Sequence, residues 1–132
     1  MTMMEWNDAL KVGHSVIDRD HQKLIRLIND LGDAMSAGQG KEVCGNVLDE
    51  LISYTQTHFA NEERLMSVHH YADTPRHKAE HAKLVKDVLA FKAKFEAGTA
   101  TLSVSLLHFL MDWLTHHILE SDKALAQGIP PG

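Results

Sequence analysis

Histidine and glutamate side chains recur at helical spacing near the middle of this 132-residue chain. His58 and Glu62 are four residues apart, and so are His77 and His81. Because residues four apart project from the same side of an α-helix, each pair can direct two side chains at one point. Imidazole suits zinc, copper and iron as a ligand, and carboxylates also bind these metals. The two pairs therefore predict a metal site built between helices.

The C-terminal part of the chain offers a choice between two further pairs of ligands. His116 and Glu120 have the four-residue spacing. His117 and Asp122 are five apart and diverge by about 140° on a regular helix. The apolar stripe of this segment consists of Leu107, Leu110, Leu114, Ile118 and Leu125. Because His116 and Glu120 lie on the side away from that stripe, we favour the other pair. This choice predicts a π-helical turn that brings both of its side chains inward.

Seven side chains with ligand atoms are predicted to face the interior. They are His21, His58, Glu62, His77, His81, His117 and Asp122. A tetrahedral zinc site takes four ligands, so this set fits two metal ions better. If both carboxylates and an oxygen atom bridge the ions, the ion that has only two of the five histidines keeps an open position. With no adjacent acid, base or nucleophile, such a position favours small-molecule binding over hydrolysis, and a redox metal, with iron as the first choice.

Composition and charge restrict the class of protein. Hydrophobic residues make up 44% of the chain, which suits one domain over residues 1–132 with an apolar core. The formal net charge of −5 disfavours nucleic acid as a partner. No apolar run approaches the ~18 residues that a membrane-spanning helix needs. The single cysteine, Cys44, and an N-terminus without a signal-peptide pattern predict a cytoplasmic protein.

Four helices are needed to position the ligands, and the chain is predicted to be all-α. Apolar periodicity places the helices at about 16–37, 41–66, 75–97 and 103–127, after an irregular N-terminal arm over about 1–15. Ser15 and Asp18 fit a capping box at the start of the first helix, and His21 lies on the apolar stripe of that helix. Thr74 as N-cap, followed by Pro75, fits the start of the third helix.

Over roughly residues 5–127 the chain resembles the hemerythrins, in their bacterial single-domain form. The matching residues are Val12-Gly13 and Ile17-Asp18 before His21, His58-x3-Glu62, His77-x3-His81, and Trp113-Leu114 before His117-x4-Asp122. The resemblance implies an up-down-up-down antiparallel four-helix bundle with an irregular N-terminal arm. It also implies a non-haem di-iron centre, in which two iron ions share an oxygen-atom bridge.

The resemblance further implies a role for each ligand and a function. His77, His81 and His117 would hold a six-coordinate iron, His21 and His58 the iron that binds O2, and Glu62 and Asp122 would bridge the two. The implied function is reversible O2 binding, for oxygen transport, storage or delivery to an oxygen-using enzyme, with no enzymatic activity of its own. Two alternatives stay open: oxygen or redox sensing through a separate partner, and a di-iron oxidase or peroxidase.

Apolar and histidine residues outside the ligand set complete the prediction. Leu24, Phe59, Leu114 and Ile118 are expected to line the O2 pocket. Leu114 is the strongest of these candidates, because it lies about one turn before His117. The other histidines, which are His14, His69, His70, His108 and His116, are expected at the surface or in loops.

Overall fold

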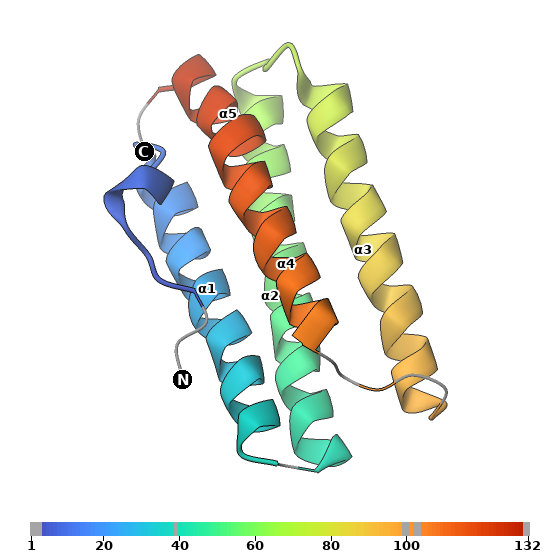
Figure 1. Cartoon of the computed structure of the whole chain (residues 1–132). Coiled ribbons are helices and arrows are strands. Elements are labelled where there is room, and N and C mark those ends of the chain that lie inside the picture. Colours follow the sequence, from blue (N-terminus) through green and yellow to red (C-terminus); the bar gives the residue numbers. More distant parts are fainter. Residues whose placement is uncertain (1–3, 39, 99–100, 102–103, 131–132) are drawn as a thin grey trace.

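The computed structural model describes residues 4–38, 40–98, 101 and 104–130, and every regular element in that part is helical. The elements are the 3₁₀ turn η1 (Asp8–Leu10), α1 (Ser15–Ser36), α2 (Lys41–Val68), α3 (Thr74–Glu96), α4 (Val104–His116), the π-helical turn η2 (His117–Asp122) and α5 (Lys123–Gly128). α4, η2 and α5 follow one another without a gap and form the fourth long helix of the bundle. This C-terminal helix lies side by side with α1, α2 and α3, and the four run in alternating directions (Figure 1). An irregular N-terminal arm packs on α1. The predicted antiparallel four-helix bundle is confirmed.

The observed bounds of the helices lie within two residues of the predicted ones. The start expected at residue 103 lies outside the described residues. Gly38 and Gly98 follow α1 and α3 with φ values of +68° and +79°. Glycine adopts this left-handed backbone without strain, so these two positions end the helices.

The start of α1 differs from the predicted capping box. The helix begins at Ser15 itself, and His14 is the N-cap, with Nδ1 accepting a bond from a backbone amide of the first turn. The Asp18 carboxylate reaches past the helix and accepts bonds from the amides of Val12 and Gly13 at 2.8 and 3.2 Å. Asp18 therefore ties the N-terminal arm to the helix, and the backbone amides of the arm replace Ser15 as its partners.

The start of α3 also differs from prediction by one position. Thr74 is the first helical residue, and Asp73 takes the N-cap position. The Thr74 hydroxyl donates to the carbonyl of Tyr71 at 2.6 Å, so the preceding turn already satisfies the side chain that was expected to cap the helix. Pro75 lies in the first turn, as predicted, where its missing amide proton has no helical partner to lose.

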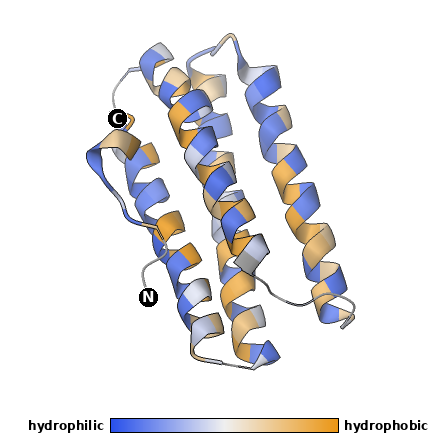
Figure 2. Cartoon of the chain, in the orientation of Figure 1, coloured by the Kyte–Doolittle hydropathy of each residue, from blue (hydrophilic) through white to orange (hydrophobic). Residues whose placement is uncertain are grey.

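Apolar side chains fill the bundle in two clusters. The larger one contains Leu24, Ile28, Leu31, Leu48, Leu51, Leu107, Leu110, Leu114 and Ile118 among others. The smaller one contains Ile17, Met66, Leu125 and Ile129. Along α1, α2 and the C-terminal helix, His21, His58, Glu62 and Asp122 lie between residues of the larger and the smaller cluster. Figure 2 shows apolar and polar positions alternating along each helix. In the part of the chain that is described, no helix is both long enough and apolar enough to cross a membrane.

Candidate metal centre

The predicted π-helical turn is present between His117 and Asp122. The amide of Lys123 donates to the carbonyl of Ile118, five residues earlier, which is the π-helical bond. Because one extra residue fits into the turn, side chains five positions apart lie nearly above one another. His117 and Asp122 are accordingly 4% and 0% exposed.

His116 lies on the outside of the same helix, as predicted. Its side chain is exposed, and Nδ1 lies 2.8 Å from the carbonyl oxygen of Asp112, to which it donates. The π-helical turn thus separates two adjacent histidines into one that faces the interior and one that faces solvent.

We expect His116→Ala to leave the metal content unchanged and His117→Ala to reduce it. The first change removes a solvated side chain, whereas the second removes a nitrogen from the centre of the cluster. Metal analysis after identical loading of both variants and the wild type tests this. A loss of metal from the His116 variant would show that the wrong histidine was chosen.

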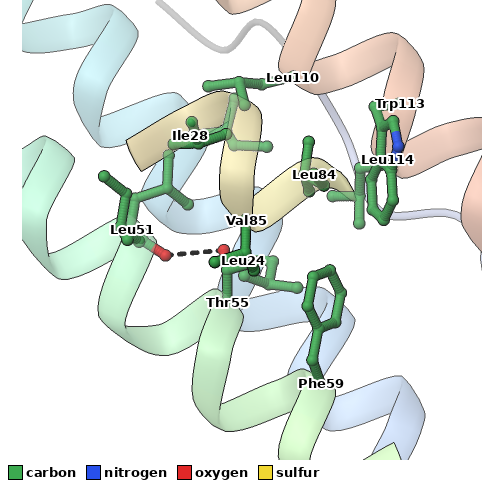
Figure 3. Close-up of a pocket in the computed structure, with 12 residues that line it drawn as sticks. Leu24, Ile28, Leu51, Thr55, Phe59, Leu84, Val85, Leu110, Trp113 and Leu114 are labelled. Carbon is green, nitrogen blue, oxygen red and sulfur yellow. Dashed lines mark hydrogen bonds between the residues drawn. The ribbon is translucent and has the colours of Figure 1, made fainter. Parts of the chain in front are cut away.

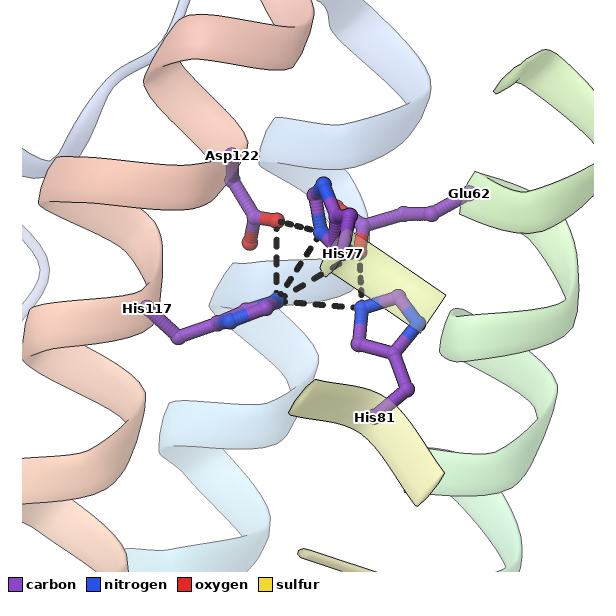
Figure 4. Close-up of side chains that lie close together, drawn as sticks. All are labelled: Glu62, His77, His81, His117 and Asp122. Carbon is purple, nitrogen blue, oxygen red and sulfur yellow. Dashed lines mark hydrogen bonds and ion pairs between the residues drawn. The ribbon is translucent and has the colours of Figure 1, made fainter. Parts of the chain in front are cut away.

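All seven predicted ligands converge, in two groups that share two carboxylates. Glu62, His77, His81, His117 and Asp122 form one group, and His21, His58, Glu62 and Asp122 form the other. Within each group, one ligand atom from every residue lies within 4.8 Å of the others. Because Glu62 and Asp122 belong to both groups, each carboxylate is placed where it could bridge two metal ions. Figure 4 shows the larger group, in which side chains from α2, α3 and η2 are directed at one point.

The spacing within the larger group matches that of ligands on a single metal ion. His117 Nε2 lies 3.2 Å from His77 Nε2 and 3.1 Å from His81 Nε2. Asp122 Oδ1 lies 3.1 Å from Nε2 of both His77 and His117. Adjacent ligands at right angles around an ion, each about 2.1 Å from it, would be about 3.0 Å apart. Converging lone pairs repel one another, and a cation between them removes that repulsion.

The smaller group is arranged more loosely around the shared carboxylates. His21 Nε2 lies 2.7 Å from Asp122 Oδ2, and His58 Nε2 lies 3.5 Å from Glu62 Oε2. The rings of His21 and His58 meet edge to face, with centroids 4.8 Å apart. Two imidazoles and two carboxylate oxygens therefore surround this second position.

Several buried polar atoms of the cluster have no hydrogen-bond partner in the described part of the chain. They are Nε2 of His58, Nδ1 of His21, His77 and His117, both oxygens of Glu62, and Oδ1 of Asp122. Glu62 Oε1 is 2.9 Å from His81 Nε2, but without hydrogen-bond geometry. Native proteins rarely leave such groups unsatisfied. Since carboxylate oxygens and the Nε2 of histidine are atoms that bind metals, these residues fit a pair of metal ions.

The charges in the metal-free cluster follow from burial and proximity. Burial, and then repulsion from Asp122, raises the pKa of Glu62 well above its ordinary value. Burial would also raise the pKa of Asp122, but the adjacent His117 holds it well below the ordinary value. For His117, burial lowers the pKa, and Asp122 followed by Glu62 outweighs it and raises the pKa to about 9. Burial and Asp122 thus favour the protonated form of Glu62, and at neutral pH His117 forms an ion pair with Asp122.

Metal binding at pH 7 is expected to release a proton from His117, because a ligand must present its lone pair to the ion. The raised pKa of His117, about 9, gives the direction: the competing proton is lost as pH rises, so metal affinity should increase from pH 7 to 9. Calorimetric titration with Zn²⁺ in buffers of different ionisation enthalpy counts the protons. Equal heats in all buffers would contradict these charge assignments.

Three carboxylates that the sequence analysis did not single out contact the outer nitrogens of ligand histidines. Asp20 Oδ2 lies 2.9 Å from His58 Nδ1, Glu63 Oε2 lies 3.1 Å from His81 Nδ1, and Glu80 Oε2 lies 3.5 Å from His117 Nδ1. Each carboxylate is adjacent in sequence to a ligand but contacts a histidine of another helix. A rotation of about 100° per residue directs it there. An acidic residue next to a ligand was the signal that could have revealed them.

An apolar cavity of about 40 Å³ lies inside the bundle. Its wall includes the predicted pocket residues Leu24, Phe59 and Leu114, together with Trp113 (Figure 3). Phe59 stacks on His81 with ring centroids 3.8 Å apart, and Trp113 stacks on His117 at 4.4 Å. The cavity therefore reaches the aromatic rings that pack on two of the ligands.

Ile118, which was also expected to line the O2 pocket, does not line this cavity. It is fully buried in the larger apolar cluster, where it fills the core beside the π-helical turn. Among the remaining histidines, His70 and His108 are exposed and His69 is half-buried. His14 lies in the loop before α1, within the expectation of a surface or loop position, but is only 3% exposed because its ring caps α1.

A four-helix bundle that gathers five histidines and two carboxylates into overlapping groups defines a protein with a dinuclear metal site. The family model of the hemerythrin HHE cation binding domain matches residues 12–127, and the chain belongs to the hemerythrin family. The resemblance inferred from the motifs is thereby confirmed.

Individual relatives extend over nearly the whole chain. The bacteriohemerythrin of Stenotrophomonas maltophilia (strain R551-3) is 36% identical over 129 residues, which cover 98% of this chain and 83% of the relative. That of Methylococcus capsulatus (strain ATCC 33009 / NCIMB 11132 / Bath) is 38% identical over 125 residues, covering 93% and 94%. A crystal structure of wild-type hemerythrin has a TM-score of 0.89 and 35% identity, covering 95% of this chain and 96% of its own.

Proposed function

We propose that this protein binds O2 reversibly at a non-haem di-iron centre. His77, His81 and His117 would hold one iron ion, and His21 and His58 would hold the iron that binds O2. Glu62 and Asp122, which belong to both groups, would bind both ions. The observation that carries this proposal is the convergence of the seven side chains into two groups that share both carboxylates. Membership of the hemerythrin family supports iron as the metal.

The donor set favours release of O2 over its further reaction. When bound, the irons would supply the electrons on which O2 binding depends. Ferritin-like di-iron proteins surround their metals with four glutamates and two histidines. This chain offers five histidines and only two carboxylates, so less negative charge is available to stabilise the oxidised metals. Return to the ferrous state is correspondingly easier.

The apolar cavity supports the same function by controlling what reaches the centre. O2 is small and apolar, whereas water and protons need polar partners along their path. Leu24, Leu114 and Phe59 line the apolar cavity with hydrocarbon surface. The cavity volume of about 40 Å³ has room for one O2 molecule. The wall thus admits O2 and keeps water and protons away from the metals.

Oxygen transport, storage or delivery to an oxygen-using enzyme is the biological role we propose. The carrier would work in the cytoplasm, where its single cysteine, Cys44, needs no disulfide partner. Within this role the protein exchanges O2 without altering an organic substrate.

A visible absorption spectrum recorded through cycles of deoxygenation and air tests the function. The iron-loaded protein should gain a band in air and lose it on deoxygenation, with unchanged iron content over repeated cycles. Steady oxidation of an added organic substrate would favour an oxidase instead. A spectrum that changes with oxidants but not with O2 would favour a redox sensor.

A further inference from the structure

Asp20 is a buried carboxylate that belongs to neither ligand group. Its side chain is 3% exposed and accepts three hydrogen bonds from α2. His58 Nδ1 donates a hydrogen bond to Oδ2 at 2.9 Å, and the Tyr54 hydroxyl donates one to Oδ1 at 2.8 Å. The side-chain amide of Asn61 donates a third to Oδ2 at 3.2 Å. Since a buried charge is costly unless its lone pairs are satisfied, these three donors fix both the ionisation and the position of the carboxylate.

The other two outer carboxylates are held less firmly. The side chains of Glu63 and Glu80 are 33% and 32% exposed, so solvent weakens their interaction with the rings they contact. Glu80 also forms an ion pair with Arg76 and accepts a hydrogen bond from the hydroxyl of Ser121. Its charge is therefore shared between three partners, whereas the Asp20 carboxylate is directed at His58 from within the bundle.

The contact with Asp20 decides which nitrogen of His58 carries the proton. An ionised carboxylate only accepts hydrogen bonds, so the proton must be on Nδ1. Nε2 then keeps its lone pair, and this is the buried atom that has no hydrogen-bond partner in the described residues and faces Glu62. His21, the other histidine of this group, has no corresponding partner at Nδ1 in the part of the chain that is described.

We propose that Asp20, braced by Tyr54 and Asn61, is a positioning residue that fixes the His58 ring and its tautomer for metal binding. The ion on the side of His21 and His58 depends on this one outer carboxylate, whereas the three-histidine side has two, both partly exposed. This inference rests on the proposed dinuclear site for its second test, but its first test needs no metal.

The first test is nitrogen NMR of the histidine rings in metal-free protein. The His58 ring should be in the Nδ1–H form in the wild type. Asp20→Asn places an amide that can donate to Nδ1, so it should shift His58 toward the Nε2–H form. Tyr54→Phe keeps the aromatic ring and removes one brace, and a smaller shift in the same direction is expected. A proton on Nε2 of wild-type His58, or an unchanged tautomer in Asp20→Asn, would overturn the proposal.

The second test is titration with Co²⁺ under reducing conditions. The wild type should bind two ions, and Asp20→Asn should bind one of them about 10- to 100-fold more weakly, the usual cost of losing an outer partner of a metal ligand. Glu63→Gln should lose less, and Asp30→Asn, which removes the same charge from an exposed position on α1, should match the wild type.

The two tests separate this inference from the function on which it rests. If the wild type binds fewer than two ions, the proposed function fails while the NMR result still decides the role of Asp20. If the wild type binds two ions and Asp20→Asn binds both with unchanged affinity, the positioning role fails and the function stands. Should Asp20→Asn not fold, the wild-type tautomer and the Tyr54→Phe shift decide the question.

Discussion

Glu62→Ala is expected to lose both metal ions, and not merely to weaken O2 binding. Glu62 is fully buried, belongs to both ligand groups, and lies within 3.5 Å of the Nε2 atoms of His58, His77 and His81. Removing it leaves two cations separated by one carboxylate, Asp122, and their mutual repulsion is no longer compensated. Breaking a buried set of paired charges typically costs about 3 to 5 kcal/mol, equivalent to more than a hundredfold in affinity.

Metal analysis after loading and dialysis measures this effect, and circular dichroism reports whether the helices persist. Glu50→Ala is the matched control, because it removes an exposed glutamate from the same helix and should retain both ions. Retention of two ions by a folded Glu62→Ala protein would show that Glu62 does not bridge them.

Leu114→Ala should shorten the period over which O2 binding stays reversible, with little change in iron content. Leu114 is 5% exposed, lines the apolar cavity and lies one turn before His117. Truncation removes packing that typically contributes ~2 to 5 kcal/mol and enlarges the cavity toward the centre. Water and protons then reach the metals more readily, and irreversible oxidation accelerates.

Successive cycles of oxygenation and deoxygenation, followed by visible absorption with iron measured in parallel, quantify the loss of reversibility. Leu107→Ala provides the comparison, since it truncates an equally buried leucine of α4 that does not line the cavity. Both variants should be destabilised to a similar degree, and only Leu114→Ala should oxidise faster. Equal oxidation rates in the two variants would show that Leu114 does not protect the metals from water and protons.

Local pattern in the sequence determined the helices and the candidate metal ligands. Residues four apart share a helical face whatever the rest of the chain does, so His58 with Glu62 and His77 with His81 were evident without a structure. The conflict between five-residue spacing and a regular helix likewise predicted the π-helical turn between His117 and Asp122, which the structure confirms.

Only the tertiary structure decided which carboxylates contact the outer nitrogens of candidate ligand histidines on another helix. Asp20, Glu63 and Glu80 lie beside ligands in sequence, yet each contacts a histidine elsewhere in the bundle, a relation set by helix packing. The same holds for the arm that takes Asp18 as its partner and for Ile118, which packs in the core and not on the cavity wall. Periodicity fixes the face of a residue on its own helix. What that face meets depends on the rotation and axial offset of the neighbouring helices, which follow from the packing of the whole core.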